Sequence, residues 1–168
     1  MKYIAFGKAD PSWDWKTFDF DKDPARLAEA RKMFNATDPD LSIFRSRGGK
    51  LLMHFGWADT ALTPYMAVDY YEKALAANGP DTKGLLPLLH RPGMFHCRGG
   101  VGTDRFDAMT AVIDWVERGV TPTSLPSSRV EDGKVVRTRP LCPYPQVARY
   151  GGSGSIDDAG SFACTEPR

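Results

Sequence analysis

Two short stretches of the chain place an ionisable side chain directly after a run of apolar residues. Asp59 follows the run at residues 51–55, and His96 follows the run at residues 85–89. Open α/β sheets carry their catalytic loops at the carboxyl ends of such strands. In a serine hydrolase, an imidazole takes the proton of the serine hydroxyl and a carboxylate orients that imidazole. Asp59 and His96 are therefore the candidate acid and base of a catalytic triad.

The serine that such a triad needs is not evident in the chain. In an α/β-hydrolase the nucleophile precedes the acid, and the acid precedes the histidine. Upstream of Asp59, Ser46 comes nearest to a Gly-x-Ser-x-Gly turn, but Phe44 stands in place of the first glycine. Ser153 lies in a glycine-rich stretch downstream of His96, which is the wrong order. We therefore assign no nucleophile.

Six motifs occur in an order and at spacings that together are far more specific than any one alone. They are Gly48-Gly49-Lys50-Leu51-Leu52, Gly56-Trp57-Ala58-Asp59, Tyr70-Tyr71-Glu72, Pro92-Gly93-Met94-Phe95-His96-Cys97, Trp115-Val116-Glu117-Arg118-Gly119 and Arg139-Pro140-Leu141-Cys142-Pro143-Tyr144-Pro145. Over nearly the whole chain they resemble the C-terminal part of the tannase and feruloyl esterase family. The resemblance implies an α/β protein with a partial α/β-hydrolase fold, and cleavage of aromatic esters such as galloyl or feruloyl esters.

The resemblance also implies roles for single residues. Family members use a serine within a Cys-Ser pair, an aspartate, and a histidine followed by a cysteine that is bonded to the elbow cysteine. Asp59, His96 and Cys97 match three of these five positions. The part of the family that holds the elbow, the oxyanion donors and most of the lid has no counterpart here, so we expect Cys97 to be a free thiol. From the residues alone, Cys97 could also be a reactive thiolate beside the histidine.

The two remaining cysteines predict a disulfide. Cys142 and Cys164 flank a loop rich in Gly, Pro and Ser, and a bridge between them would restrict the unfolded chain. The corresponding pair is bonded in the family that the chain resembles. Two unrelated buried thiols are the alternative. A disulfide suits an oxidising compartment, in keeping with the secreted or periplasmic location that the resemblance implies, although no signal-peptide pattern opens the sequence.

The elements that must position these residues follow from apolar spacing and from Gly and Pro. Residues 49–89 predict a strand, a helix and a second, parallel strand, with the helix starting at Thr63-Pro64 and ending at Asn78-Gly79-Pro80. Residues 2–6 predict a short strand, and Pro and Gly after residue 120 predict an irregular tail. A further helix is expected near residues 105–118, with Gly119 as its stop and a buried stripe of Phe106, Met109, Val112, Ile113 and Val116.

Composition narrows the class of protein. With 168 residues, 42% of them hydrophobic, the chain predicts a single domain over residues 1–168. The 22 basic and 21 acidic residues leave no charge footprint for nucleic acid, and no apolar run approaches the roughly 20 residues of a membrane span. We expect no cofactor. His54, Asp59 and His96 lack the spacing of a zinc site, and Asp157-Asp158 is expected to be solvated, so no metal is assigned.

These observations favour a carboxylic ester hydrolase whose small-molecule substrate is an aromatic ester, with Asp59 as acid and His96 as base. The alternative is a non-catalytic protein, either truncated or binding an aromatic ligand. A third reading has Cys97, or a water activated by His96, replace the serine. Because few predicted strands are available to cover the helices, we expect self-association or a complementary N-terminal half.

Overall fold

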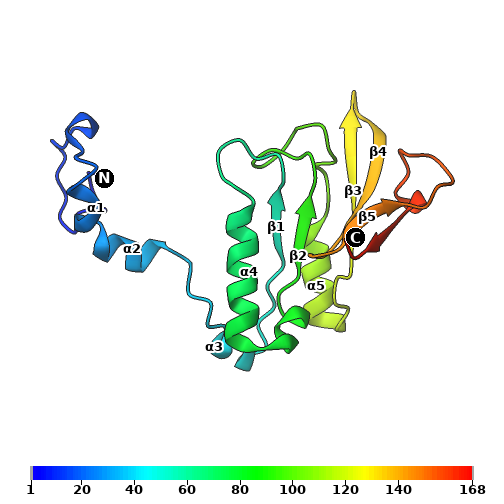
Figure 1. Cartoon of the computed structure of the whole chain (residues 1–168), viewed down its shortest axis with the longest axis horizontal. Helices are drawn as coiled ribbons and strands as arrows, with labels where there is room; N and C mark the ends of the chain where they lie inside the picture. Colours follow the sequence, from blue (N-terminus) through cyan, green and yellow to red (C-terminus); the bar gives the residue numbers. More distant parts are fainter. Residues whose placement is uncertain (1, 168) are drawn as a thin grey trace. The chain divides into compact units, whose positions relative to one another are not determined.

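Two compact units divide the chain, Met1–Asp38 and Pro39–Arg168. The computed structural model describes residues 2–167, and each unit is described by itself (Figure 1). The single domain expected over residues 1–168 stays a prediction.

The first unit consists of turns and three short helical segments. These are η1 (Trp15–Thr17), α1 (Asp23–Arg26) and α2 (Ala28–Phe34). The strand expected at residues 2–6 is wrong, because these residues form turns. Gly7 has a φ of 70°, and the Asp10 N–H donates to the Lys2 carbonyl at 2.6 Å, which closes a loop instead of extending the chain.

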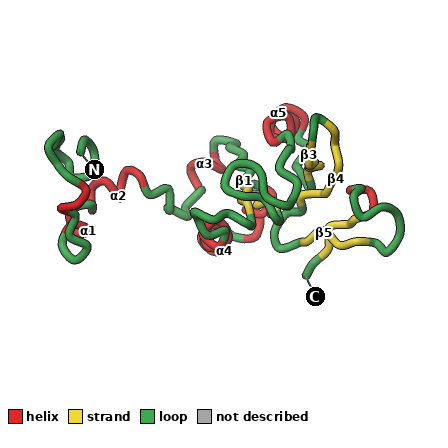
Figure 2. The backbone as a smooth tube through the Cα atoms, turned by 90° about the horizontal axis from the view of Figure 1, so that it is seen from above, coloured by secondary structure: helices red, strands yellow, loops and turns green. Residues whose placement is uncertain are grey.

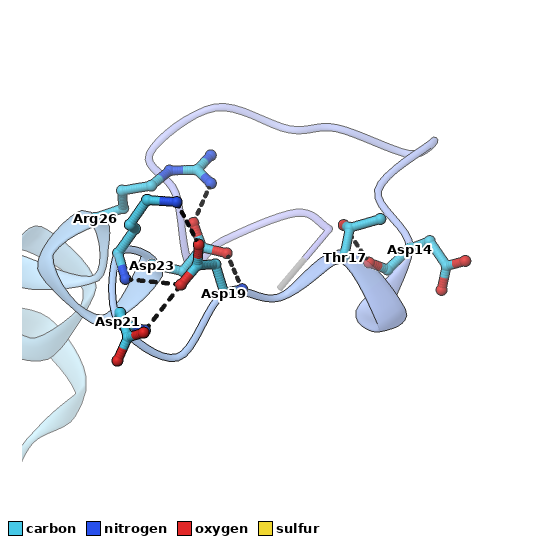
Figure 3. Close-up of polar contacts among 7 residues, drawn as sticks. Asp14, Thr17, Asp19, Asp21, Asp23 and Arg26 are labelled. Atoms are coloured by element: carbon cyan, nitrogen blue, oxygen red, sulfur yellow. Dashed lines mark hydrogen bonds and ion pairs between the residues drawn. The ribbon is translucent and has the colours of Figure 1, made fainter.

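Aspartates hold the turns of this first unit (Figure 3). Asp19 accepts hydrogen bonds from the Asp21 and Lys22 N–H groups at 2.9 and 3.2 Å. Asp23, on the first turn of α1, accepts from the Asp19 N–H at 2.9 Å and pairs with the Arg26 guanidinium at 2.5 Å. These carboxylates satisfy backbone donors of the turn that leads from η1 into α1.

The second unit contains the predicted strand, helix and strand. β1 (Met53–Gly56) pairs in parallel with β2 (Leu88–Arg91), and α4 (Tyr65–Asn78) connects them through η2 (Pro80–Gly84). A short helix, α3 (Ser42–Ser46), precedes β1. Pro64 is the N-cap of α4, so Thr63 does not cap it as expected. The crossover itself is confirmed.

Apolar side chains cover both faces of the β1–β2 pair. On one face, Ala67, Tyr71 and Ala74 of α4 pack with Leu86 and Leu88. On the other face, Leu89 packs with Leu125 and Leu141, and Leu52, Phe106 and Ala111 surround this cluster. Figure 2 shows α4 and α5 on opposite sides of β1. The strands that precede Asp59 and His96 therefore lie inside a small layered core.

Helix α5 (Ala108–Arg118) ends as predicted, but it begins three residues after the expected start near residue 105 and faces the core differently. The Asp107 carboxylate caps it by accepting from the Thr110 N–H at 2.9 Å, and Gly119 closes it with a φ of 70°. The predicted buried stripe is wrong: Met109 is 70% exposed and Val116 is 63% exposed, whereas Trp115 is buried. The helix is apolar on two faces, and only the face with Trp115 is covered.

The expected irregular tail is also wrong, because it forms two antiparallel ribbons. β3 (Leu125–Glu131) pairs with β4 (Lys134–Leu141), and β5 (Val147–Tyr150) pairs with β6 (Phe162–Thr165), with η3 (Ala159–Ser161) before β6. Asp132 and Gly133 both have positive φ, 49° and 75°, as a two-residue hairpin loop requires. Prolines paired in the β3–β4 ladder, Pro126 with Pro140, concealed the strand pattern.

The predicted disulfide is confirmed. Cys142 and Cys164 are bonded across 22 positions of sequence, joining the end of β4 to β6. Cys97 is a free, exposed thiol, also as expected. Within the described residues no helix is long and apolar enough to cross a membrane.

Replacing Cys142 and Cys164 together with serine should lower the free energy of unfolding by about 3 kcal/mol, since the bridge removes loop entropy from the unfolded chain. Urea unfolding followed by circular dichroism measures this loss. Cys97→Ser is the matched control and should leave the midpoint unchanged. A double variant as stable as the wild type would contradict a stabilising role for the bridge.

Candidate active site

The loop after β1 is tied to the loop after β2 by backbone hydrogen bonds. The Trp57 N–H donates to the Arg91 carbonyl at 3.0 Å, and the Ala58 N–H donates to the Met94 carbonyl at 2.9 Å. Gly56 makes this approach possible, because a β-carbon there would collide with the carbonyls of Phe95 and Met94. The two candidate loops are thus joined at the carboxyl edge of the parallel pair.

The loop that carries His96 is a tight, anchored turn. Gly93 adopts a φ of 73°, and its carbonyl accepts from the Gly102 N–H at 2.9 Å. Met94 is fully buried beneath it. The Asp104 carboxylate accepts from the Gly99 N–H at 2.9 Å on the far side of the turn. His96 is therefore presented from a backbone fixed at both ends.

Asp59 and His96 meet as the sequence predicts. The His96 Nδ1 lies 2.7 Å from the Asp59 Oδ2, across 37 positions of sequence. The Asp59 side chain is 1% exposed, whereas the His96 side chain is 56% exposed. With Nδ1–H donated to the carboxylate, Nε2 is left as the nitrogen able to accept a proton. The distance is that of a hydrogen bond; the catalytic roles stay proposals.

A turn after Asp59 keeps its carboxylate ionised. Oδ1 accepts from the Leu62 N–H at 3.0 Å and from the Ala61 N–H at 2.8 Å. These hydrogen bonds, that to Leu62 foremost, together with His96, lower the pKa of Asp59 below its ordinary value. The two oxygens thus have separate tasks: Oδ1 holds the loop and Oδ2 orients His96.

His54 does not join the pair. Its Nδ1 lies 3.1 Å from the Arg91 Nη1, and because a guanidinium only donates, this nitrogen is the acceptor. Desolvation, followed by the Arg91 charge, lowers the pKa of His54. The described residues hold no group of three or more His, Cys, Asp or Glu side chains able to bind a metal ion. The histidine of β1 is a structural partner of Arg91.

Arg91 is a residue of this region that sequence reasoning missed. It is 3% exposed, its guanidinium stacks 4.0 Å from the Phe106 ring centroid, and Nη2 donates to the Asp104 carbonyl at 3.4 Å. Burial lowers the pKa of Arg91 to about 10. Through Asp104 and Phe106, Arg91 holds the segment that follows the His96 turn. A sequence signal for its role was its position as a charged residue just after the apolar run at residues 85–89.

His90 is packed among aromatic rings. Its ring centroid lies 4.3 Å from that of Trp57 and 5.0 Å from that of Tyr144. Burial lowers the pKa of His90. In the described part of the chain, His96 makes no side-chain hydrogen bond other than that to Asp59, and no serine hydroxyl contacts its ring in this way.

Known proteins resemble this chain in both sequence and fold. The model of the family described as tannase and feruloyl esterase matches residues 1–165. A mono(2-hydroxyethyl) terephthalate hydrolase from Piscinibacter sakaiensis is 44% identical over 161 residues, which are 89% of this chain and 26% of that protein. The crystal structure of an esterase from Aspergillus oryzae superposes with a TM-score of 0.80 at 27% identity, covering 98% of this chain and 36% of its own. That of feruloyl esterase B from Aspergillus oryzae gives 0.75 at 25% identity, covering 98% and 36%.

Asp59→Asn should reverse the tautomer of His96. The asparagine Oδ1 still accepts from the loop, but its amide donates toward Nδ1, so the ring proton moves to Nε2. Nitrogen-15 NMR of the ring in alkaline solution, where histidines are neutral, should show Nδ1–H in the wild type and Nε2–H in the variant. His54 is the internal control, because Arg91 keeps it as Nε2–H in both proteins. An Nε2–H tautomer of His96 in the wild type would exclude the orientation described above.

Proposed function

This chain belongs to the tannase and feruloyl esterase family, and we propose that it supplies the acid and base of a carboxylic ester hydrolase acting on aromatic esters. The single observation that carries the proposal is the 2.7 Å contact between Asp59 and His96. The names of the relatives, a terephthalate ester hydrolase and a feruloyl esterase, support an aromatic acyl group. The chain spans about a quarter to a third of the length of these relatives.

We propose further that residues 1–168 form the C-terminal part of an α/β-hydrolase catalytic domain. The parallel β1–β2 pair, with α4 on one face and α5 on the other, supports this assignment. The candidate residues follow the carboxyl ends of both strands, where such sheets place their sites. The Cys142–Cys164 bridge supports an oxidising location, periplasmic or outside the cell.

The proposed mechanism assigns one task to each group. A serine from a complementary segment attacks the ester carbonyl while His96 Nε2 takes its proton and Asp59 stabilises the imidazolium. Backbone amides of that segment stabilise the oxyanion. His96 then gives the proton to the leaving alcohol and activates the water that releases the acid. The 56% exposure of the His96 side chain supports this division, because its outer nitrogen is open to a group from another segment.

Two other readings remain as alternatives to this proposal. In the first, the chain is a non-catalytic protein that binds an aromatic ligand. In the second, it is an enzyme in which Cys97, or a water activated by His96, replaces the serine. Cys97 is exposed and adjacent to His96, which favours testing the thiol route directly. Cys97→Ala, which adds no bulk beside His96, should abolish activity only if the thiol is the nucleophile.

Activity should appear when this chain is joined to the segment that precedes the matched region in the Piscinibacter relative. We expect the chimera to hydrolyse an aryl or feruloyl ester, and the chain alone to show little turnover because it lacks a nucleophile. His96→Ala and Asp59→Asn should each lower kcat/KM of the chimera about ten-thousand-fold. Hydrolysis is followed by absorbance of the released acid.

Asp107→Asn is the matched control for these variants, because asparagine also caps α5. It should leave kcat/KM within about twofold, a change of less than 1 kcal/mol in the barrier. Robust, His96-dependent turnover by the chain alone would show that no serine from another segment is needed. A folded chimera that binds the ester without cleaving it would favour the ligand-binding reading.

Exposed apolar surface in the second unit supports a partner. Met109, Ile113 and Val116 lie at helical spacing on α5 and are 70%, 43% and 63% exposed. Within residues 2–167, β1 pairs only with β2, so its other edge presents unpaired backbone groups. Open edges and apolar patches both favour association. We propose that a complementary N-terminal half, or a second copy of the chain, covers them.

Charge placed on α5 should therefore reduce self-association of the purified chain. Ile113→Lys introduces a cation into the proposed interface and should shift the mass measured by light scattering toward the monomer. Val136→Lys is the matched control, since Val136 on β4 is also 43% exposed. It should leave the mass unchanged. A wild-type chain that stays monomeric at high concentration would rule out the second copy as the occupant.

A further inference from the structure

A small cavity of about 250 Å³ lies between the ribbons of the tail and the loop after β2. Its walls include Leu141 of β4, Val147 of β5, and Pro92 and Thr103 from the two sides of the His96 turn. A water molecule takes about 30 Å³ of liquid, so the space suits one small organic molecule better than a single water. Neither Asp59 nor His96 lines it.

The charge of this cavity is positive. Arg137 and Arg139 both line it, and no acidic residue does. Arg137 Nε donates to the Asp157 carboxylate at 2.6 Å, so its charge is partly balanced. Arg139 forms no ion pair with any described carboxylate; its Nη1 donates to the neighbouring Thr138 carbonyl at 2.7 Å. One guanidinium at the wall therefore has no carboxylate within ion-pair distance, although the charge of Asp157, which pairs with Arg137, partly offsets the fall in the pKa of Arg139.

Arg139 is also held in place before any ligand arrives. Its guanidinium carbon lies 4.1 Å from the Phe162 ring centroid, and this stacking limits rotation of the side chain. Burial, and then the charge of Arg137, lowers the pKa of Arg139, in keeping with a cation that is partly removed from water. A preorganised, partly desolvated guanidinium loses little entropy when it binds an anion.

We propose that this cavity binds a small organic carboxylate with an apolar body, for which benzoate is the simplest example. The planar fork of Arg139 matches a carboxylate in two parallel hydrogen bonds. Pro140, Leu141 and Val147 supply apolar wall on which a ring can pack. An inorganic anion would satisfy the arginine but leave these walls in contact with water.

The position of the cavity links its occupant to the His96 turn. Pro92 and Thr103 stand at the two ends of that turn, which the Gly102 N–H closes by donating to the Gly93 carbonyl at 2.9 Å. A bound acid touches both ends and stabilises the closed turn. An aromatic acid is also the product class of the proposed hydrolysis; this link, unlike the site itself, rests on the proposed function.

The test titrates the full chain with benzoate, benzamide and inorganic phosphate by isothermal calorimetry. Benzoate should bind saturably with one site, and benzamide and phosphate should each bind at least about tenfold more weakly, because one lacks the charge and the other the apolar body. Equal binding of benzoate and benzamide would overturn the role of the cation. Phosphate bound as tightly as benzoate would overturn the organic-acid assignment.

Variants then locate the site. Arg139→Gln should weaken benzoate binding about tenfold or more, and Arg139→Lys, which keeps the charge but not the fork, by a smaller factor. Arg149→Gln is the matched control, because Arg149 lies on β5 but does not line the cavity. The affinity of this variant for benzoate should stay within twofold of that of the wild type. Circular dichroism checks that each variant is folded.

Unchanged affinity in a folded Arg139→Lys and a folded Arg139→Gln would overturn the proposal. Because calorimetry needs no turnover, this result is independent of whether the chain proves to be an esterase.

Discussion

The parallel pairing of β1 with β2 is the interaction on which the candidate site depends. It aligns the carboxyl ends of two strands that α4 separates in sequence, and the Trp57 and Ala58 N–H groups extend the pairing into the following loops. Asp59 and His96 come within 2.7 Å because the backbone beneath them is already joined. Removal of α4 or of either strand would separate Asp59 from His96 before any side chain was altered.

Residues at the ends of elements were the most predictable from sequence. The crossover over residues 49–89, the stop at Gly119 and the closeness of Asp59 to His96 follow from apolar runs and from Gly and Pro. The Cys142–Cys164 bridge followed from loop composition together with the family resemblance. The elements were thus specified by local signals, whereas the bridge needed the resemblance as well.

Other features depend on long-range contacts that local patterns do not carry. Helix α5 is apolar on two faces, so periodicity could not tell that Trp115 is buried while Met109 is exposed. In the tail, Pro126 and Pro140 made two strands read as irregular chain. Arg91 was passed over because its partners, Phe106 and His54, are brought to it only by folding. Local patterns located the crossover and helix α5, but they missed the strands of the tail and the face that α5 buries.

The close approach at Gly56 limits which residue this position can hold. A side chain at this position would collide with the carbonyls of Phe95 and Met94 and push the two loops apart, although glycine carries no group that takes part in chemistry. The contact between Asp59 and His96 therefore depends on a residue without a side chain. A search for functional positions by chemical type alone would overlook Gly56, although any larger residue there displaces the loops that carry Asp59 and His96.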